Sequence, residues 1–126
     1  FNSFFQWIYK NLTKNNKINV VSDLYSTPTW SKSLAVAIHK SIVMNTKGLY
    51  HYAGLNPISR LDFSKLICKH FNLNERLLIP SKAKDLTFEA NRPILSNLSS
   101  KKIEKEICFN ALDVEYCIRQ ISNQIR

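Results

Sequence analysis

Apolar side chains recur every three or four residues in about five stretches of the chain, the spacing that places them on one face of a helix. Asn2 precedes the first stretch, and its side-chain oxygen can accept an early backbone N–H as an N-cap. The apolar positions that follow are Phe4, Phe5, Ile8 and Leu12. Residues 11–16 are polar and poor in helix formers, so we expect the first helix to end there.

The other predicted helices begin at polar residues that can cap them. Thr29 or Ser31 can cap the second helix, and Ser59 resembles the first residue of a capping box that opens the third. A short helix is predicted at Lys101–Ile107, and Asp113 can cap the last helix. Apolar faces are marked by Leu34, Ala35, Ala37, Ile38, Ile42 and Val43 in the second helix, by Phe63, Leu66, Ile67 and Phe71 in the third, and by Val114, Cys117, Ile118, Ile121 and Ile125 in the last.

Short strands are predicted at Ile18–Val21, Gly48–Gly54 and Leu77–Pro80, where apolar or β-branched residues stand together. The third should lie at a sheet edge, because a proline has no N–H to donate to a neighbouring strand. Residues 92–98 should be extended as well. These strands are too few and too separated for a complete parallel sheet. The first two are each followed by a helix, so we expect them to be edge strands of a larger α/β sheet.

The size of the chain bounds its organisation. With 126 residues it is one domain or part of one, and an apolar fraction of 44% suffices for a core of modest size. The first residue is Phe1 rather than Met, so we expect a piece of a longer protein or a processed form. No apolar run approaches the roughly 20 residues that span a bilayer, and Phe1–Trp7 lacks the basic start of a signal peptide. These features predict a cytoplasmic protein without a membrane partner.

The charge balance favours an anionic partner. The chain has 18 basic and 9 acidic residues and a net charge of +9 at neutral pH. Nucleic acid, an acidic membrane surface and a phosphorylated small molecule all carry the complementary charge. The basic residues are scattered, with their densest group at Lys101, Lys102 and Lys105. Such scatter is typical of a solvated surface, so nucleic acid is not favoured.

Residues with reactive side chains form no recognisable catalytic or metal motif. Cys68, Cys108 and Cys117 make no CxxC pair, and the histidines have no paired ligand spacing, so no metal site is expected. Three thiols fit a reducing compartment, with two of them on predicted helix faces. His51 has no nucleophile or acid at a motif spacing, so we favour a packed or hydrogen-bonded structural histidine within a strand. Glycine-rich phosphate loops and a Tyr-x-x-x-Lys motif are absent, so neither a dinucleotide site nor catalytic residues are expected in this chain.

Three motifs stand in a fixed order along the chain. Residues 23–29 read Asp-Leu-Tyr-Ser-Thr-Pro-Thr, residues 48–54 read Gly-Leu-Tyr-His-Tyr-Ala-Gly, and residues 92–98 read Arg-Pro-Ile-Leu-Ser-Asn-Leu. Together they resemble the dTDP-4-dehydrorhamnose reductases, a family of extended short-chain dehydrogenase/reductases. The family's first motif is Asp-Gln-x-Gly-x-Pro-Thr, from which Leu24 and Ser26 depart. The resemblance covers nearly the whole chain.

The resemblance implies a fold and a division of labour. Residues 1–126 would form the C-terminal, sugar-nucleotide-binding part of a Rossmann-type α/β reductase, helix-rich with a few short strands. The N-terminal domain, which binds NADPH or NADH and carries the catalytic tyrosine and lysine, would be absent from this chain and would be its partner. A homodimer stays open. The parent protein would reduce dTDP-4-dehydrorhamnose, whereas this chain alone would bind no cofactor and would be inactive.

Arg92 is the first candidate for a substrate contact that the resemblance implies. Its guanidinium offers a planar fork of donors that suits a diphosphate, and Pro93 keeps its backbone extended. In related extended reductases, an arginine in this region contacts the phosphates of the sugar nucleotide. The alternative is a surface ion pair with Asp85 or Glu89.

The loop of the first motif supplies the other candidates. Tyr25 can stack on a base or a sugar, and Thr29, Trp30 and Asn2 complete the expected substrate contacts. A purely structural turn at residues 23–30 stays open. So do two other functions: a regulatory subunit of methionine adenosyltransferase, as in some members of the wider family, and a basic anion- or nucleic-acid-binding module. The last would need a basic helix face or an aromatic platform.

Overall fold

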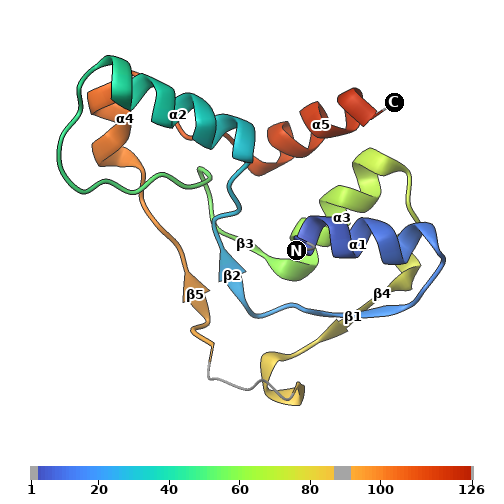
Figure 1. The fold of residues 1–126 in the computed structure, drawn as a ribbon. Helices are drawn as coiled ribbons and strands as arrows, with labels where there is room; N and C mark the ends of the chain where they lie inside the picture. The colour runs from blue at the N-terminus through green and yellow to red at the C-terminus, as the bar shows by residue number, and fades with distance from the viewer. Residues whose placement is uncertain (1–2, 87–91, 126) are drawn as a thin grey trace.

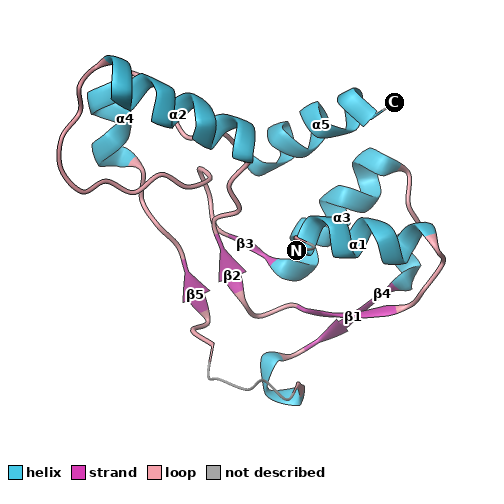
Figure 2. Ribbon diagram, in the orientation of Figure 1, coloured by secondary structure: helices cyan, strands magenta, loops and turns pink. Residues whose placement is uncertain are grey.

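A computed structural model describes residues 3–86 and 92–125 as a mixed α/β fold rich in helix (Figures 1 and 2). The helices are α1 (Phe4–Thr13), α2 (Ser31–Val43), α3 (Arg60–Phe71), α4 (Lys101–Ile107) and α5 (Val114–Ile125). The strands are β1 (Ile18–Val21), β2 (Tyr25–Ser26), β3 (Ile58–Ser59), β4 (Leu78–Ser81) and β5 (Leu95–Ser96). Two 3-10 turns, η1 (Glu75–Leu77) and η2 (Ala83–Asp85), flank β4. This order confirms the predicted fold class.

The strands form two small sheets. In the first, β1 pairs in parallel with β4, so that Ile18 lies opposite Leu78. In the second, the order is β3-β2-β5, with β2 antiparallel to β3 and parallel to β5. Tyr25 is the centre of that sheet, opposite Ser59 on one side and Leu95 on the other. The second sheet therefore brings together the segments before α2 and α3 and the motif that begins at Arg92.

The helix starts confirm some predicted caps and correct others. Ser59 accepts the Asp62 N–H at 3.0 Å, and Asp113 accepts the N–H groups at the start of α5, as predicted. The N-cap of α1 is Ser3 rather than Asn2, which lies outside the described residues. Ser3 and Gln6 form a reciprocal capping box that a cap one residue earlier could not form, because the N3 residue would then be a phenylalanine.

The start of α2 has no side-chain cap, so the prediction of Thr29 or Ser31 was wrong. Trp30 is the N-cap residue, and its carbonyl accepts from both the Leu34 N–H and the Ser33 hydroxyl. The Thr29 hydroxyl donates to the Thr27 carbonyl at 3.3 Å, within the loop. None of the described helices is long and apolar enough to cross a membrane.

Residues 48–54 do not form the predicted strand; they begin at a bend, where Gly48 has a φ of 118°. Their backbone groups bind side chains rather than another strand: Ala53 exchanges two hydrogen bonds with the Ser100 hydroxyl, and the Leu49 carbonyl accepts from Lys102 at 3.0 Å. His51 is exposed and lies outside any strand, so the packed alternative predicted for this histidine was wrong. Gly54 packs so closely that a Cβ there would lie 2.2 Å from the Pro28 carbonyl oxygen.

Buried side chains gather in two clusters. Figure 1 shows α2 and α4 at one end of the view and α1 and α3 at the other. We call the larger the α1–α3–α5 cluster; it comprises Ile8, Leu12, Ile18, Val20, Leu61, Ile67, Cys68, Leu77, Leu78 and Ile118. We call the smaller the α2–α4 cluster; it comprises Ala37, Ile103 and Ile107, with Tyr50, Tyr52 and Phe109 packed against them. The second sheet lies between the two ends.

Candidate functional site

A cavity of about 880 Å³ lies between α1, the start of α3, α5 and the segment that follows β2. Its volume is within the range of small-molecule sites, roughly 300–1,000 Å³. The wall is largely aromatic and aliphatic, and Lys10 and Arg60 bring positive charge to it. The apolar lining includes Phe4, Phe5, Tyr9, Trp30, Phe63 and Ile121. Such a wall suits a ligand that combines a ring with an anionic group.

The aromatic part of the wall is positioned by the first turn of α1. The capping box at Ser3 fixes the start of the helix, so that Phe4 and Phe5 project beside α3. The Phe4 ring stacks with Phe63 at a centroid distance of 6.1 Å, and Phe5 meets Phe71 edge-on at 5.6 Å. These ring contacts hold the α1 side of the cavity against α3.

Thr29 and Trp30 lie in the wall of this cavity. Pro28 precedes them and also lines the cavity. Its ring fixes the backbone angle φ and so the direction of the chain before Thr29. The Lys32 ammonium lies 5.6 Å from the centroid of the Trp30 ring, a cation–π contact. Two of the residues predicted from the loop are thus at a site that a small molecule could enter.

Tyr25 and Arg92 are not in the cavity wall. Tyr25 is 40% exposed in β2, and its backbone N–H donates to the Ile94 carbonyl at 2.8 Å. Arg92 is exposed and lies just before that segment. The structure therefore brings Tyr25 and Arg92 to the same end of the second sheet, where β2 and β5 both begin, while Thr29 and Trp30 follow the other end of β2.

Arg60 is a charged residue of the cavity wall that the sequence reading missed. Its guanidinium carbon lies 5.3 Å from the centroid of the Phe4 ring. Burial, with a smaller contribution from the charge of Arg92, lowers the pKa of Arg60 below its ordinary value. A signal was present in the sequence: a cation at the first position of a helix opposes the helix dipole, so an arginine directly after the Ser59 cap is unfavourable there.

Asp23, the first residue of the loop motif, has a structural role. Its Oδ1 accepts the Ala83 N–H at 2.9 Å and so ties the loop to η2. Leu24, which stands where the resembling family has glutamine, is buried. The start of the loop is thus anchored to the rest of the fold, whereas its later residues, Thr29 and Trp30, line the cavity.

Two of the three cysteines are buried, and the third, Cys108, is exposed. Burial raises the pKa of the Cys68 thiol to about 11, and burial also raises the pKa of Cys117. Both thiols are therefore protonated at neutral pH and behave as small apolar side chains. Within residues 3–86 and 92–125, no group of three His, Cys, Asp or Glu side chains is arranged to hold a metal ion.

Comparison with known proteins identifies the family of the fold. A family model described as the RmlD substrate binding domain matches residues 1–126. No curated protein sequence matches the chain. The match to the family model confirms the resemblance seen in the three motifs.

Solved structures resemble the chain over its whole length. A dTDP-4-dehydrorhamnose reductase from Bacillus anthracis, in complex with NADP, has a TM-score of 0.86 and 22% identity over 100% of this chain. Such reductases from Yersinia enterocolitica and Clostridium acetobutylicum have TM-scores of 0.84 and 0.86, each at 21% identity, over 100% and 99% of this chain. At these identities the likeness shows a shared fold. This chain covers only 44% of each of the three, less than half their length.

Proposed function

Because this chain belongs to the RmlD substrate-binding domain family, we propose that it is the sugar-nucleotide-binding part of a longer reductase that acts on dTDP-4-dehydrorhamnose. The observation that carries the proposal is the match of that family model over all 126 residues. The cavity agrees with it, because an aromatic wall with a guanidinium is chemically suited to a nucleoside diphosphate sugar.

In this proposal the two ends of β2 have different tasks. Arg92, at the start of the second sheet, binds the diphosphate through its fork of N–H donors. Trp30 and Thr29, beyond the other end of β2, contact the sugar or the base in the cavity. Tyr25 lies beside the diphosphate and covers it from solvent. We also keep Asn2, outside the described residues, as a substrate contact.

The residues of this chain do not fit a nicotinamide cofactor. Its glycines, Gly48 and Gly54, form no phosphate-binding turn, and the approach of Pro28 fills the space beside Gly54. We therefore assign NADPH or NADH, and the residues that donate protons to the substrate, to a Rossmann domain in the remainder of the longer protein. The task of this chain is to hold the sugar nucleotide and to exclude water from it.

Titration of dTDP against the longest natural protein that contains this chain tests the proposal. Arg92→Ala removes a charge-assisted contact, so we expect the dissociation constant for dTDP to rise about 10- to 150-fold while that for NADPH stays unchanged. Arg92→Lys should restore binding only in part, because an ammonium cannot reproduce the fork.

Calorimetry at two salt concentrations separates the alternatives. A nucleic-acid-binding module would lose nucleic-acid affinity steeply with salt and would be indifferent to dTDP. A regulatory subunit would bind neither dTDP nor the dTDP-sugar in unmutated form. Equal dTDP affinity in the unmutated and Arg92→Ala proteins would remove Arg92 from the site.

A further inference from the structure

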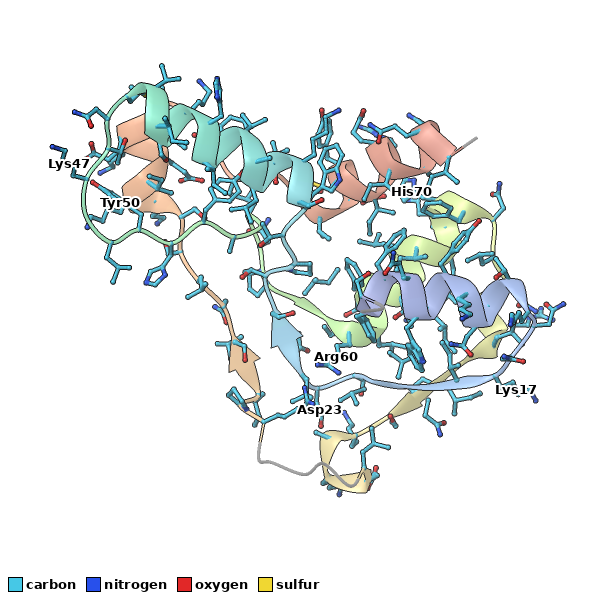
Figure 3. All side chains as sticks on the ribbon, in the orientation of Figure 1. Lys17, Asp23, Lys47, Tyr50, Arg60 and His70 are labelled. Atoms are coloured by element: carbon cyan, nitrogen blue, oxygen red, sulfur yellow. The ribbon has the colours of Figure 1, made fainter. Side chains whose placement is uncertain are left out.

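Arg60 is held in place by backbone and ring contacts at the edge of the second sheet. Its N–H donates to the Leu24 carbonyl at 3.2 Å, directly before β2, and it is the first residue of α3. Its guanidinium lies over the Phe4 ring and lines the cavity. Figure 3 shows its side chain beside the start of β2, near Asp23. Both its position and its orientation are therefore defined before any ligand binds.

The charge of Arg60 has no anionic partner among the residues that the structure describes, since its side chain has neither a hydrogen bond nor an ion pair there. The nearby carboxylates are engaged elsewhere. Asp62 binds the Ser59 hydroxyl at 2.6 Å, and Asp23 accepts from the Ala83 backbone. Arg60 is only half-buried, so its N–H donors stay hydrated in the absence of a ligand and are available to an anion that enters the cavity.

Arg92 reaches the same end of the second sheet from the other side of β2. The Arg60 N–H binds Leu24, and Tyr25, the next residue, binds Ile94 of the segment that Arg92 begins. The strand order β3-β2-β5 thus places the two arginines on opposite flanks of the start of β2. They are close enough for the charge of Arg92 to lower the pKa of Arg60. Two guanidinium groups on either side of one strand favour an anion that carries more than one negative group.

We propose that Arg60 is a second phosphate-binding residue of the sugar-nucleotide site, which contacts the diphosphate from the cavity side while Arg92 contacts it from the β5 side. The inference rests on the proposed function and extends it. Two forks match two phosphoryl groups, one fork for each. The stack on Phe4 orients the Arg60 fork, and the same ring lines the cavity that holds the rest of the ligand. Arg60 therefore connects the diphosphate to the aromatic part of the site.

The test compares dTDP with thymidine, which lacks phosphate, by calorimetry on the intact protein. Arg60→Gln should raise the dissociation constant for dTDP about 10- to 150-fold and leave that for thymidine unchanged. Arg60→Lys should give an intermediate value, because it keeps the charge over Phe4 and loses the fork. Arg76→Gln is the matched control, since Arg76 is exposed in η1 and lies outside the cavity. It should bind both ligands as the unmutated protein does.

The outcomes distinguish this inference from the proposed function. If Arg92→Ala weakens dTDP binding and Arg60→Gln does not, Arg60 is only a structural cover for Phe4 and the inference is overturned alone. If the unmutated protein binds no dTDP, the proposed function fails and this inference with it. Thermal unfolding of each variant identifies a folding defect. Should Arg60→Gln unfold the protein, the comparison of Arg60→Lys with the unmutated protein decides, and equal dTDP affinity in those two overturns the inference.

Discussion

The two clusters of buried side chains differ in how completely this chain covers them. In the α1–α3–α5 cluster, Ile8 and Ile67 are fully buried, enclosed by three helices and the β1–β4 pair. In the α2–α4 cluster, the inner face of α2 buries Ala37, but Ile42 on the same helix is 72% exposed. Exposed apolar residues that occur singly are ordinary, whereas a group of them on one surface marks an interface. This chain thus encloses the α1–α3–α5 cluster by itself, whereas α2, beside the α2–α4 cluster, keeps an exposed apolar face.

The exposed apolar face of α2 continues onto the segment that follows it, residues 45–52. A groove between α2 and residues 45–52 is lined by Leu34, Ile38, Ile42 and Leu49, the last of which is 79% exposed. The backbone of residues 48–54 is held by the side chains of Ser100, at Ala53, and Lys102, at Leu49. Since the chain covers 44% of the reductase structures that it resembles, we expect the rest of a longer protein to cover this surface.

Alanine substitutions in the two clusters should give the largest contrast. In residues 1–126 expressed alone, Ile67→Ala creates a cavity and should lower the free energy of unfolding by about 2–5 kcal/mol. Ile42→Ala should change it by about 0.5 kcal/mol or less, because the side chain is already in water. In the intact protein Ile42→Ala should become markedly destabilising. Denaturant unfolding of both lengths measures this, and the same small effect of Ile42→Ala in both would show that nothing covers α2.

Local signals were enough to predict several elements in both clusters. The bounds of β1 and α4 match the predictions, and the cap at Ser59 is as expected, because β-branched runs and capping residues act within a few positions. The parallel pairing of β1 with β4 joins residues about sixty positions apart, and no local pattern specifies it. The helix pattern of α2 was also correct, although its outer face has no partner here.

The candidate site was predicted only in part, because it depends on contacts between distant segments. Thr29 and Trp30 were found through the family motif and do line a cavity, whereas Arg60 was passed over as part of a helix start. The strands β2 and β5 are too short to give a period of two, so the motifs that contain them were read as loop and extended chain. The segment from Gly48 to Gly54 has a strand's composition, but Ser100 and Lys102 bind its backbone.

A smaller effect is expected at the junction between the two regions. Gly54→Ala would place a Cβ 2.2 Å from the Pro28 carbonyl oxygen, so the segment before α2 must move away. We expect a loss of about 1–3 kcal/mol in the free energy of unfolding, as for other overpacked sites. We also expect weaker dTDP binding, because Pro28, Thr29 and Trp30 line the cavity together. Asn56→Ala, at an exposed neighbouring position, is the control. Unchanged stability and dTDP affinity in Gly54→Ala would show that the close approach is dispensable.

The smallest effect concerns the ion pairs that join α3 to α5 at the surface, beside the α1–α3–α5 cluster. Hydrogen bonds to Glu115 from Lys69, at 2.7 Å, and from His70, at 3.2 Å, hold the pKa of Glu115 below its ordinary value of 4.5. A carboxyl with a depressed pKa in the folded state stabilises the fold above its unfolded pKa, and this contribution is lost as the pH falls through the folded value. Below pH 4.5, Glu115→Gln should therefore lose stability less steeply than the unmutated protein.

Thermal unfolding from pH 7 down to pH 3 measures this difference. Glu106→Gln is the control, because Glu106 is exposed and belongs to neither cluster. The effect should shrink at high salt, since the Glu115 side chain is 43% exposed and its ion pairs are screened. Such an exposed pair adds little to the stability of a cluster that is held mainly by apolar packing. If Glu115→Gln and Glu106→Gln gave the same acid profile, the contact between α3 and α5 would rest on Ile67, Ile118 and their apolar neighbours alone.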